Sequence, residues 1–212
     1  MHLVFDLDGT LVDTAKVAGK LIATMREECC LAPLAHEQLI PYMSIGGLEM
    51  IKGVLEVGEN EAEKALVCFR NRYAKTQTSL DDVYTGVPET LKALADSGAV
   101  LSICTNKPRA LAIKVLSETD LLHYFRRISA GDDLSTRKPN RLNLEACLNP
   151  GEYNSMQICM VGDSTIDEAL SCNAGVPFWF FSGGYNDGVS ASRADRSFSS
   201  YEQFPLLDLN VA

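Results

Sequence analysis

The stretch VFDLDGTLVDT, residues 4–14, places two acidic residues directly after a short apolar run. The run predicts a buried strand, and Asp6, Asp8 and Gly9 follow at its end. A turn is one explanation, because Asp hydrogen-bonds to nearby backbone and Gly adopts dihedral angles that other residues avoid. A functional site is the other, because a buried carboxylate is unfavourable without a partner. Cationic and hydroxyl partners elsewhere in the chain would favour the site.

The composition indicates a globular, acidic protein. The chain has 212 residues, of which 46 % are hydrophobic, and 19 basic and 28 acidic residues give a formal net charge of −9. This is enough for one or two domains with a substantial core. The negative charge argues against nucleic acid and anionic membranes as partners, because both attract proteins with a broad positive field. An anionic substrate would need a few local cations or a bound metal.

The sequence contains no signal for export or membrane insertion. No apolar stretch approaches the roughly 20 residues of a membrane span, and the N-terminal residues do not resemble a secretory signal. The seven cysteines are an odd number without a CxxC pair, so we expect reduced thiols, mostly in the core. These features predict a cytoplasmic protein, and we expect a monomer or weak homodimer.

Five apolar runs predict the strands of a sheet. They are nearly continuous, as in parallel sheets that are covered on both faces, and they cover residues 2–7, 99–105, 126–130, 157–163 and 177–181. Helical patterns at 87–98, 108–121 and 164–175 alternate with them. This alternation predicts an α/β fold with a doubly wound, Rossmann-like, mostly parallel sheet.

Residues 14–83 interrupt this alternation. They contain three or four helical segments, including those at 14–29, 46–57 and 59–76, and no convincing strand. We therefore predict a small α-helical domain, called the cap below, inserted after the first strand. The catalytic core would comprise residues 1–13 and 84–212, and the two connections, near Asp13-Thr14 and Asp81-Asp82, would form a hinge.

Polar residues follow the predicted strands at the edge where ligands bind in open α/β sheets. Thr105 and Asn106 follow the second strand, Asp163 and Asp167 follow the fourth, and Lys138 precedes the fourth. Each also has a purely structural explanation. Thr105 could be a helix N-cap, Lys138 could be a solvated loop residue, and the two acids could cap the start of a helix and stabilise its positive end. Their convergence on one edge favours a functional site.

These residue types suit phosphoryl transfer. A phosphate monoester carries about −1.5 to −2 charges, so a carboxylate about 4 Å away meets roughly 6–8 kcal/mol of repulsion at an effective dielectric constant near 20. Asp6 and Asp163, with a backbone carbonyl, form an oxygen site suited to Mg²⁺. Lys138 supplies another positive charge, and Thr105 can bind phosphate oxygens. Positioning and electrostatics are what this reaction chiefly requires.

Four segments resemble, in order and spacing, the motifs of haloacid dehalogenase-like hydrolases: DLDGTLVDT, CTNKP, RKPN and VGDSTIDEALSCNAG. The resemblance spans nearly the whole chain. The segment YTGVPETLKALADSG and the cap are similar to the phosphoglycolate phosphatase-like branch, which has a mobile helical cap.

The resemblance implies a role for each matching residue. Asp6 would attack phosphorus and form an aspartyl-phosphate, and Asp8 would act as general acid and then as general base. Thr105 and Lys138 would be catalytic and, with Asn106, would bind the phosphate. Mg²⁺ would be held by Asp6, Asp8, Asp163 and Asp167.

The cap offers candidates for substrate specificity. Gly46 and Gly47 allow close approach of the backbone to a ligand, or they form a helix–helix turn. One cap helix carries a basic group, Arg70, Arg72 and Lys75. These residues are expected either to meet a second anionic group of the substrate or to be solvated helix charges. Residues 181–188, FSGGYNDG, also face the site in the predicted topology.

These features predict a Mg²⁺-dependent phosphatase of a small phosphorylated metabolite, with 2-phosphoglycolate as the best candidate. A sugar phosphomutase of the β-phosphoglucomutase type uses the same nucleophile and acid, and is an alternative. A non-catalytic phosphate-binding module is another, against which the complete set of motif residues argues.

Overall fold

A single parallel sheet organises the core. The computed structural model describes residues 1–154 and 157–206, and its six strands have the order β3-β2-β1-β4-β5-β6. The strands are β1 (His2–Phe5), β2 (Val100–Cys104), β3 (Arg127–Ser129), β4 (Ile158–Gly162), β5 (Phe178–Phe181) and β6 (Arg196–Phe198). The order reverses between β1 and β4, which creates a crevice at their carboxyl ends. The predicted doubly wound fold is confirmed.

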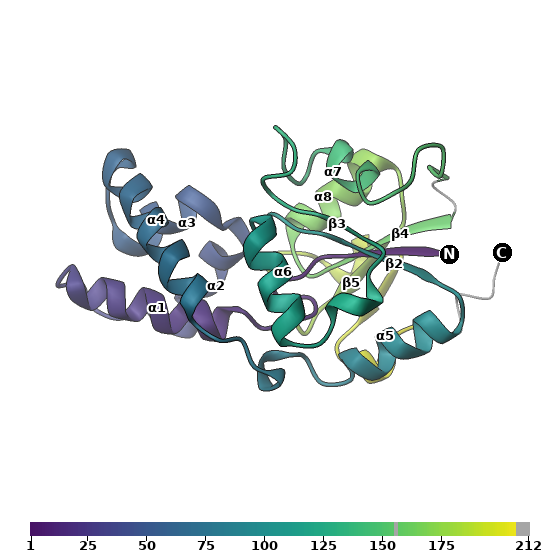
Figure 1. The fold of residues 1–212 in the computed structure, drawn as a ribbon, viewed down its shortest axis with the longest axis horizontal. Coiled ribbons are helices and arrows are strands. Elements are labelled where there is room, and N and C mark those ends of the chain that lie inside the picture. The colour runs from purple at the N-terminus through teal and green to yellow at the C-terminus, as the bar shows by residue number, and fades with distance from the viewer. Residues whose placement is uncertain (155–156, 207–212) are drawn as a thin grey trace.

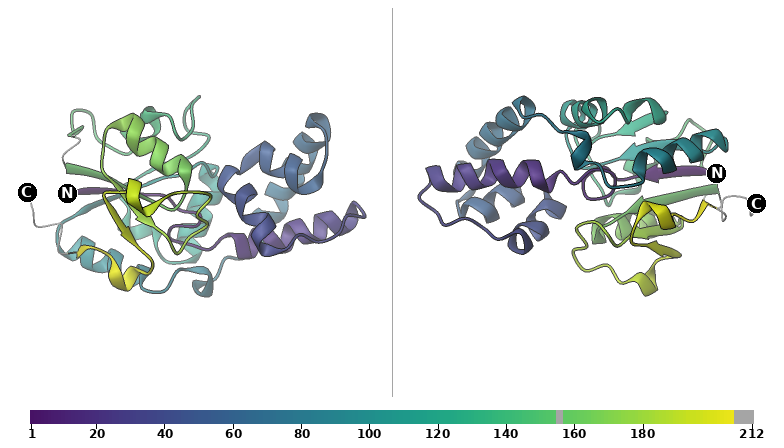
Figure 2. Two further views of the ribbon diagram at one scale, coloured as in Figure 1. Left: turned by 180° about the vertical axis from the view of Figure 1, so that it is seen from behind. Right: turned by 90° about the horizontal axis from the view of Figure 1, so that it is seen from below.

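Helices cover both faces of the sheet (Figure 2). Alternate strand residues point to opposite faces, so Leu3 and Phe5 of β1 belong to one buried cluster and Val4 to another. The first cluster includes α5 (Val87–Asp96) and α6 (Arg109–Glu118), and the second includes α7 (Arg141–Glu145) and α8 (Thr165–Ala174). Within the described ranges, no helix is long and apolar enough to cross a bilayer.

The cap consists of four helices beyond the carboxyl ends of the strands (Figure 1). They are α1 (Ala15–Glu28), α2 (His36–Ile45), α3 (Gly47–Leu55) and α4 (Glu59–Lys75), and they confirm the predicted helical insertion. Its two connections lie side by side: the Asp13 N–H donates to the Asp82 carbonyl at 2.7 Å, and the Tyr84 N–H to the Leu11 carbonyl at 3.1 Å. The domain limits at residues 13/14 and 83/84 stay a prediction.

Helix α2 and strand β6 have no clear signal in the sequence. Helix α2 contains Pro41, and an interior proline normally argues against a helix because it lacks an N–H and crowds the preceding turn. Strand β6 has three residues, of which Arg196 and Ser197 are exposed, so no apolar run indicates it. Conversely, β1 ends at Phe5, and Asp6 therefore belongs to the loop that follows it.

The cysteines are less buried than expected. All seven are free thiols, and only Cys104, Cys147 and Cys159 are buried, whereas Cys29, Cys30 and Cys172 are exposed and Cys68 is intermediate. The expectation that most of them are core residues was wrong. Apolar sequence neighbours indicated burial, but Cys172 lies on an amphipathic helix, α8, where those neighbours occupy the buried face.

His2 should make the stability of the sheet depend on pH. Its side chain is buried in β1, and Nε2 lies 2.9 Å from Ser102 Oγ in β2. Burial, followed by repulsion from Arg126, lowers the pKa of His2 to about 4. The folded chain therefore binds this proton less tightly than the unfolded chain does. The free energy of unfolding is therefore higher above pH 6.5, and it falls as the pH is lowered toward 4.

The variant His2→Gln tests this expectation in urea unfolding. Between pH 7 and pH 4 the wild type should lose about 2–3 kcal/mol more of its free energy of unfolding than the variant does. Carboxylates that titrate in the same range are common to both proteins, so they cancel in the difference. Parallel pH profiles for the two proteins would contradict the expectation.

Candidate active site

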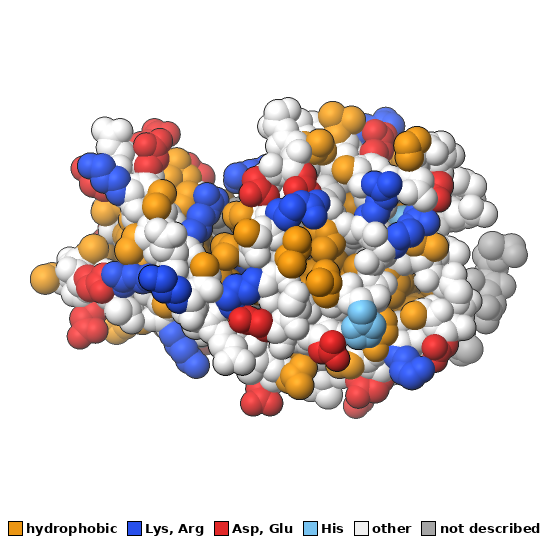
Figure 3. All heavy atoms as spheres, viewed as in Figure 1, with side chains coloured by type: hydrophobic (Ala, Val, Ile, Leu, Met, Phe, Trp, Pro, Cys, Tyr) orange, Lys and Arg blue, Asp and Glu red, His pale blue; other side chains and the backbone are white. Residues whose placement is uncertain are grey.

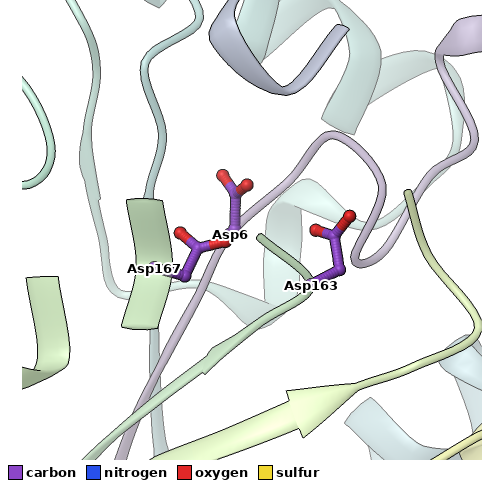
Figure 4. Close-up of side chains that lie close together, drawn as sticks. All are labelled: Asp6, Asp163 and Asp167. Carbon is purple, nitrogen blue, oxygen red and sulfur yellow. The ribbon is translucent and has the colours of Figure 1, made fainter. Parts of the chain in front are cut away.

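Three buried carboxylates meet at the carboxyl ends of β1 and β4. Each of Asp6, Asp163 and Asp167 offers an oxygen, and these oxygens lie within 4.8 Å of one another. In Figure 4, Asp6 stands between the other two side chains. Asp163 and Asp167 are fully buried and Asp6 is 7 % exposed. Because β1 and β4 are parallel neighbours, residues far apart in the sequence follow them at the same edge.

Lys138 joins two of these carboxylates. Its Nζ lies 2.8 Å from Asp6 Oδ1 and 2.7 Å from Asp167 Oδ1. Burial alone would lower the pKa of Lys138, but the charges of Asp167 and Asp6 outweigh burial and raise that pKa above its ordinary value. The Asn106 side-chain oxygen accepts the Lys138 N–H at 2.9 Å, which holds the loop in place. Lys138 is therefore a buried ammonium group and not a solvated loop residue.

Asp163 has only neutral hydrogen-bond donors. Its oxygens accept the Thr10 hydroxyl at 2.6 Å and the Tyr185 N–H at 2.8 Å, and no ammonium or guanidinium group of the described residues forms an ion pair with it. Burial, reinforced by the charges of Asp167 and Asp6, raises the pKa of Asp163 well above its usual range. Burial also raises the pKa of Asp6 to about 7, although Lys138 opposes this. The cluster therefore lacks positive charge beside Asp163.

The cluster fits a divalent cation. All its donors are carboxylate oxygens, which are the ligands of hard cations such as Mg²⁺. Asp6 Oδ1 is buried and, although Lys138 lies close to it, receives no well-directed hydrogen bond from the part of the chain that the structure describes. A cation bound by Asp6, Asp163 and Asp167 would supply the missing charge.

Asp8 lies outside this cluster and has its own partners. Lys107 Nζ is 2.7 Å from Asp8 Oδ1, and the Thr14 hydroxyl donates to the same oxygen. Lys107 also lies 4.6 Å from the centre of the Tyr73 ring on helix α4 of the cap. Sequence reasoning missed Lys107, because within CTNKP it has the appearance of an ordinary loop lysine. Its ammonium group links an acid of the core to the cap.

Two of the structural explanations can now be judged. The Thr105 hydroxyl accepts the Lys107 N–H at 3.1 Å, and the N-cap of α6 is Pro108, so Thr105 is not a helix cap. Asp167 does belong to the cap of helix α8: Ser164 is the N-cap, and Asp167 completes the capping box by accepting the N–H and the hydroxyl of Ser164 at 3.2 and 2.7 Å. Its other oxygen is the one that binds Lys138, and Asp167 therefore serves both purposes.

The DxDG stretch is also both a turn and part of the site. Gly9 has a φ of +80°, and a Cβ at this position would lie 2.3 Å from Asp163 Oδ2. Only glycine accommodates this conformation and this close approach. The turn therefore brings the loop after β1 against the carboxylate after β4.

One cavity of about 330 Å³ lies between the core and the cap, where Figure 3 shows a notch between the two parts of the molecule. All predicted site residues except the fully buried Asp167 line it: Asp6, Asp8, Gly46, Gly47, Thr105, Asn106, Lys138 and Asp163. Arg70 and Tyr185 line it too. Arg72 instead forms two hydrogen bonds with Glu28, at 2.9 and 2.8 Å.

Comparison with known proteins agrees with this geometry. The family model for haloacid dehalogenase-like hydrolases matches residues 3–181. The chain is 33 % identical over 211 residues to a plasmid-encoded phosphoglycolate phosphatase of Cupriavidus necator, covering 97 % of this chain and 91 % of that protein. It is 33 % identical over 192 residues to a phosphoglycolate phosphatase of Agrobacterium fabrum, with 87 % and 81 % covered.

A solved structure shares the fold. The β-phosphoglucomutase of Clostridium difficile superposes with a TM-score of 0.78 at 16 % identity, over 96 % of this chain and 92 % of that one. With the family model matching from β1 through β5, the chain belongs to the haloacid dehalogenase-like hydrolases.

Proposed function

We propose that this protein is a Mg²⁺-dependent phosphatase of small phosphorylated metabolites, with 2-phosphoglycolate as the leading candidate substrate. The observation that carries the proposal is the arrangement around Asp6. This carboxylate lies against Lys138 and lines the cavity, and a second acid, Asp8, follows two residues later and lines the same cavity. Relatives that are 33 % identical and named phosphoglycolate phosphatase support this substrate. A cavity of about 330 Å³ is large enough for a metabolite of this size.

In the first step a carboxylate oxygen of Asp6 attacks phosphorus. A new O–P bond forms and the bond from phosphorus to the substrate oxygen breaks. The leaving alkoxide takes a proton from the Asp8 carboxyl group, which balances its charge. Lys138 lies beside the attacking group, Thr105 lines the same cavity, and both side chains would hold the phosphoryl oxygens.

In the second step water hydrolyses the aspartyl-phosphate. Asp8, now a carboxylate, removes a proton from the attacking water, and the bond between phosphorus and Asp6 breaks. The products are the alcohol, inorganic phosphate and the enzyme in its starting state. The same carboxyl group thus acts first as acid and then as base.

A divalent cation bound by Asp6, Asp163 and Asp167 would offset the repulsion between the carboxylates and the phosphate dianion. The remaining electrostatic work falls to the chain itself. Lys138 neutralises one side of Asp6 at 2.8 Å, and Lys107 holds Asp8 in place at 2.7 Å. Lys138 is buried and the Lys107 side chain is 11 % exposed, so their charges are weakly screened by solvent.

Asp6→Asn should abolish phosphate release, because an amide is not a nucleophile toward phosphorus. With p-nitrophenyl phosphate and Mg²⁺, we expect at least about a 10³-fold loss of kcat. Asp96→Asn, which changes an exposed residue paired with Lys92, is the control and should retain activity. Undiminished phosphate release by Asp6→Asn would refute the mechanism. Interconversion of hexose phosphates by the wild type without net phosphate release would indicate a mutase.

Mg²⁺ should stabilise the folded chain. At a Mg²⁺ concentration of about 100 Kd, binding contributes about 2.7 kcal/mol, which corresponds to a rise in Tm of roughly 5–10 °C for a chain of this size. Asp163→Asn should lose most of this rise in thermal unfolding, whereas Asp96→Asn should retain it. An identical response of all three proteins would place the metal elsewhere.

Lys107→Met should impair turnover while the protein remains folded, because Asp8 loses the ammonium group that positions it. We expect kcat to fall about 10- to 100-fold. The contact with the cap can be tested separately: Tyr73→Leu removes the ring that faces Lys107, and Tyr73→Phe keeps it. Steady-state kinetics should show a larger loss for Tyr73→Leu, and equal losses would show that the ring contact is unimportant.

A further inference from the structure

We propose that Arg70 and Arg137 form a second anion-binding subsite in the cavity, which receives a carboxylate or a second phosphate at the far end of the phosphorylated substrate. The inference rests on the proposed function, because the first anion is the phosphoryl group that reacts with Asp6. It goes further by assigning residues to substrate selection.

The two arginines come from different parts of the molecule and line the same cavity. Arg70 lies on helix α4 of the cap, and Arg137 lies in the core directly before Lys138. Arg137 reaches the cap, because a Cβ placed on Gly47, the first residue of α3, would lie 3.4 Å from Arg137 Nη1. The subsite therefore spans the boundary between cap and core.

Neither guanidinium group forms an ion pair with a carboxylate of the described residues. Arg137 Nε donates to the Gly131 carbonyl at 2.9 Å, and Arg70 donates no hydrogen bond to a described residue. The other two arginines of the cap differ in this respect: Arg26 pairs with Glu56 at 3.0 Å and Arg72 with Glu28 at 2.8 Å. Arg70 is thus the cap arginine that retains its charge for a ligand.

The surroundings of Arg70 leave positive charge in excess. Burial and then the nearby charge of Arg137 lower the pKa of Arg70, and the acid that opposes them is Asp132. Asp132 already accepts the Arg109 N–H at the start of α6, at 2.7 Å. Two like charges that share a half-enclosed cavity are unfavourable, and an anion between them would relieve the repulsion.

Further hydrogen-bond donors stand at the same end of the cavity. Gly46 and Gly47 line it at the start of α3, and the first N–H of this helix with an intrahelical acceptor is that of Met50. The earlier N–H groups carry the partial positive charge of a helix N-terminus. The hydroxyl of Ser44, another lining residue, is buried and has no hydrogen-bond partner among the described residues.

This subsite is distinct from the position of the reacting phosphate. The ammonium groups of the core are already paired with acids, Lys138 with Asp6 and Lys107 with Asp8. Arg137 and Lys138 are sequence neighbours with different environments: Lys138 is buried among carboxylates, and Arg137 is exposed beside the cap. One loop thus supplies a cation to each end of the cavity.

The test compares three substrates in the presence of Mg²⁺. 2-Phosphoglycolate carries a distal carboxylate, ethylene glycol bisphosphate carries a distal phosphate, and 2-phosphoglycolamide replaces the carboxylate by a neutral amide of the same shape. For the wild type we expect kcat/KM to be about 10- to 100-fold higher for at least one of the two esters with a distal anion than for the amide, as for a charge-assisted hydrogen bond. Whichever of these two esters has the higher kcat/KM shows whether the subsite prefers a carboxylate or a phosphate.

Arg70→Gln and Arg137→Gln should each remove most of this preference and leave kcat/KM for the amide within about threefold. Arg70→Lys should restore part of it, because a lysine keeps the charge without the planar fork. Arg72→Gln, which changes the same helix outside the cavity, should leave all three values unchanged. Binding of 2-phosphoglycolate to Asp6→Asn, measured by calorimetry, should weaken by a similar factor when Arg70→Gln is added.

The outcomes separate the two proposals. If the wild type hydrolyses none of these esters nor p-nitrophenyl phosphate, the proposed function fails. If it hydrolyses all three equally well, the phosphatase stands and the second subsite is refuted. If the arginine variants lower kcat/KM for all three substrates by the same factor, the guanidinium groups bind the reacting phosphate and the inference is likewise overturned.

Discussion

The mutual repulsion of three buried carboxylates governs the organisation of this site. Asp6, Asp163 and Asp167 lie within 4.8 Å of one another, and a pair of unit charges about 4 Å apart repels by roughly 4 kcal/mol at an effective dielectric constant near 20. Lys138 forms ion pairs with two of the three carboxylates, and neutral donors near a backbone turn surround the third, Asp163. The loop of Lys138, fixed by Asn106, is therefore as much part of the site as the strands are.

The sequence was most informative where a local pattern determines structure. Continuous apolar runs predicted five of the six strands, and the order of the polar residues that follow them placed Asp6, Thr105 and Asp163 at one edge. Strand β6 was not predicted, and no residue range was predicted for helix α2, because their local signals are weak or opposite. Strand β6 buries one of its three residues, and α2 contains Pro41. These two elements form because the rest of the fold offers them a surface.

Contacts between the cap and the core could not be predicted in the same way. Lys107 matters because it lies between Asp8 and the ring of Tyr73, and no spacing in the sequence brings those two residues together. Helix geometry determines which basic residues of α4 face the cavity. Residues two apart point about 200° from each other around a helix, so Arg70 faces the cavity while Arg72 turns away to Glu28.

The distribution of charge gives the cap a role in the proposed binding of the distal anion. The chain carries a formal net charge of −9, and the core end of the cavity is acidic, so an approaching phosphate ester is attracted chiefly at the boundary where Arg70 and Arg137 stand. Because Arg70 lies in the cap and Arg137 in the core, a second anion bound between them would join the two parts of the molecule. That same arrangement holds Lys107 between Tyr73 and Asp8. In the proposed mechanism, a distal anion that joins cap and core would also keep Asp8, the proposed general acid, in position, so that recognition would be coupled to reaction.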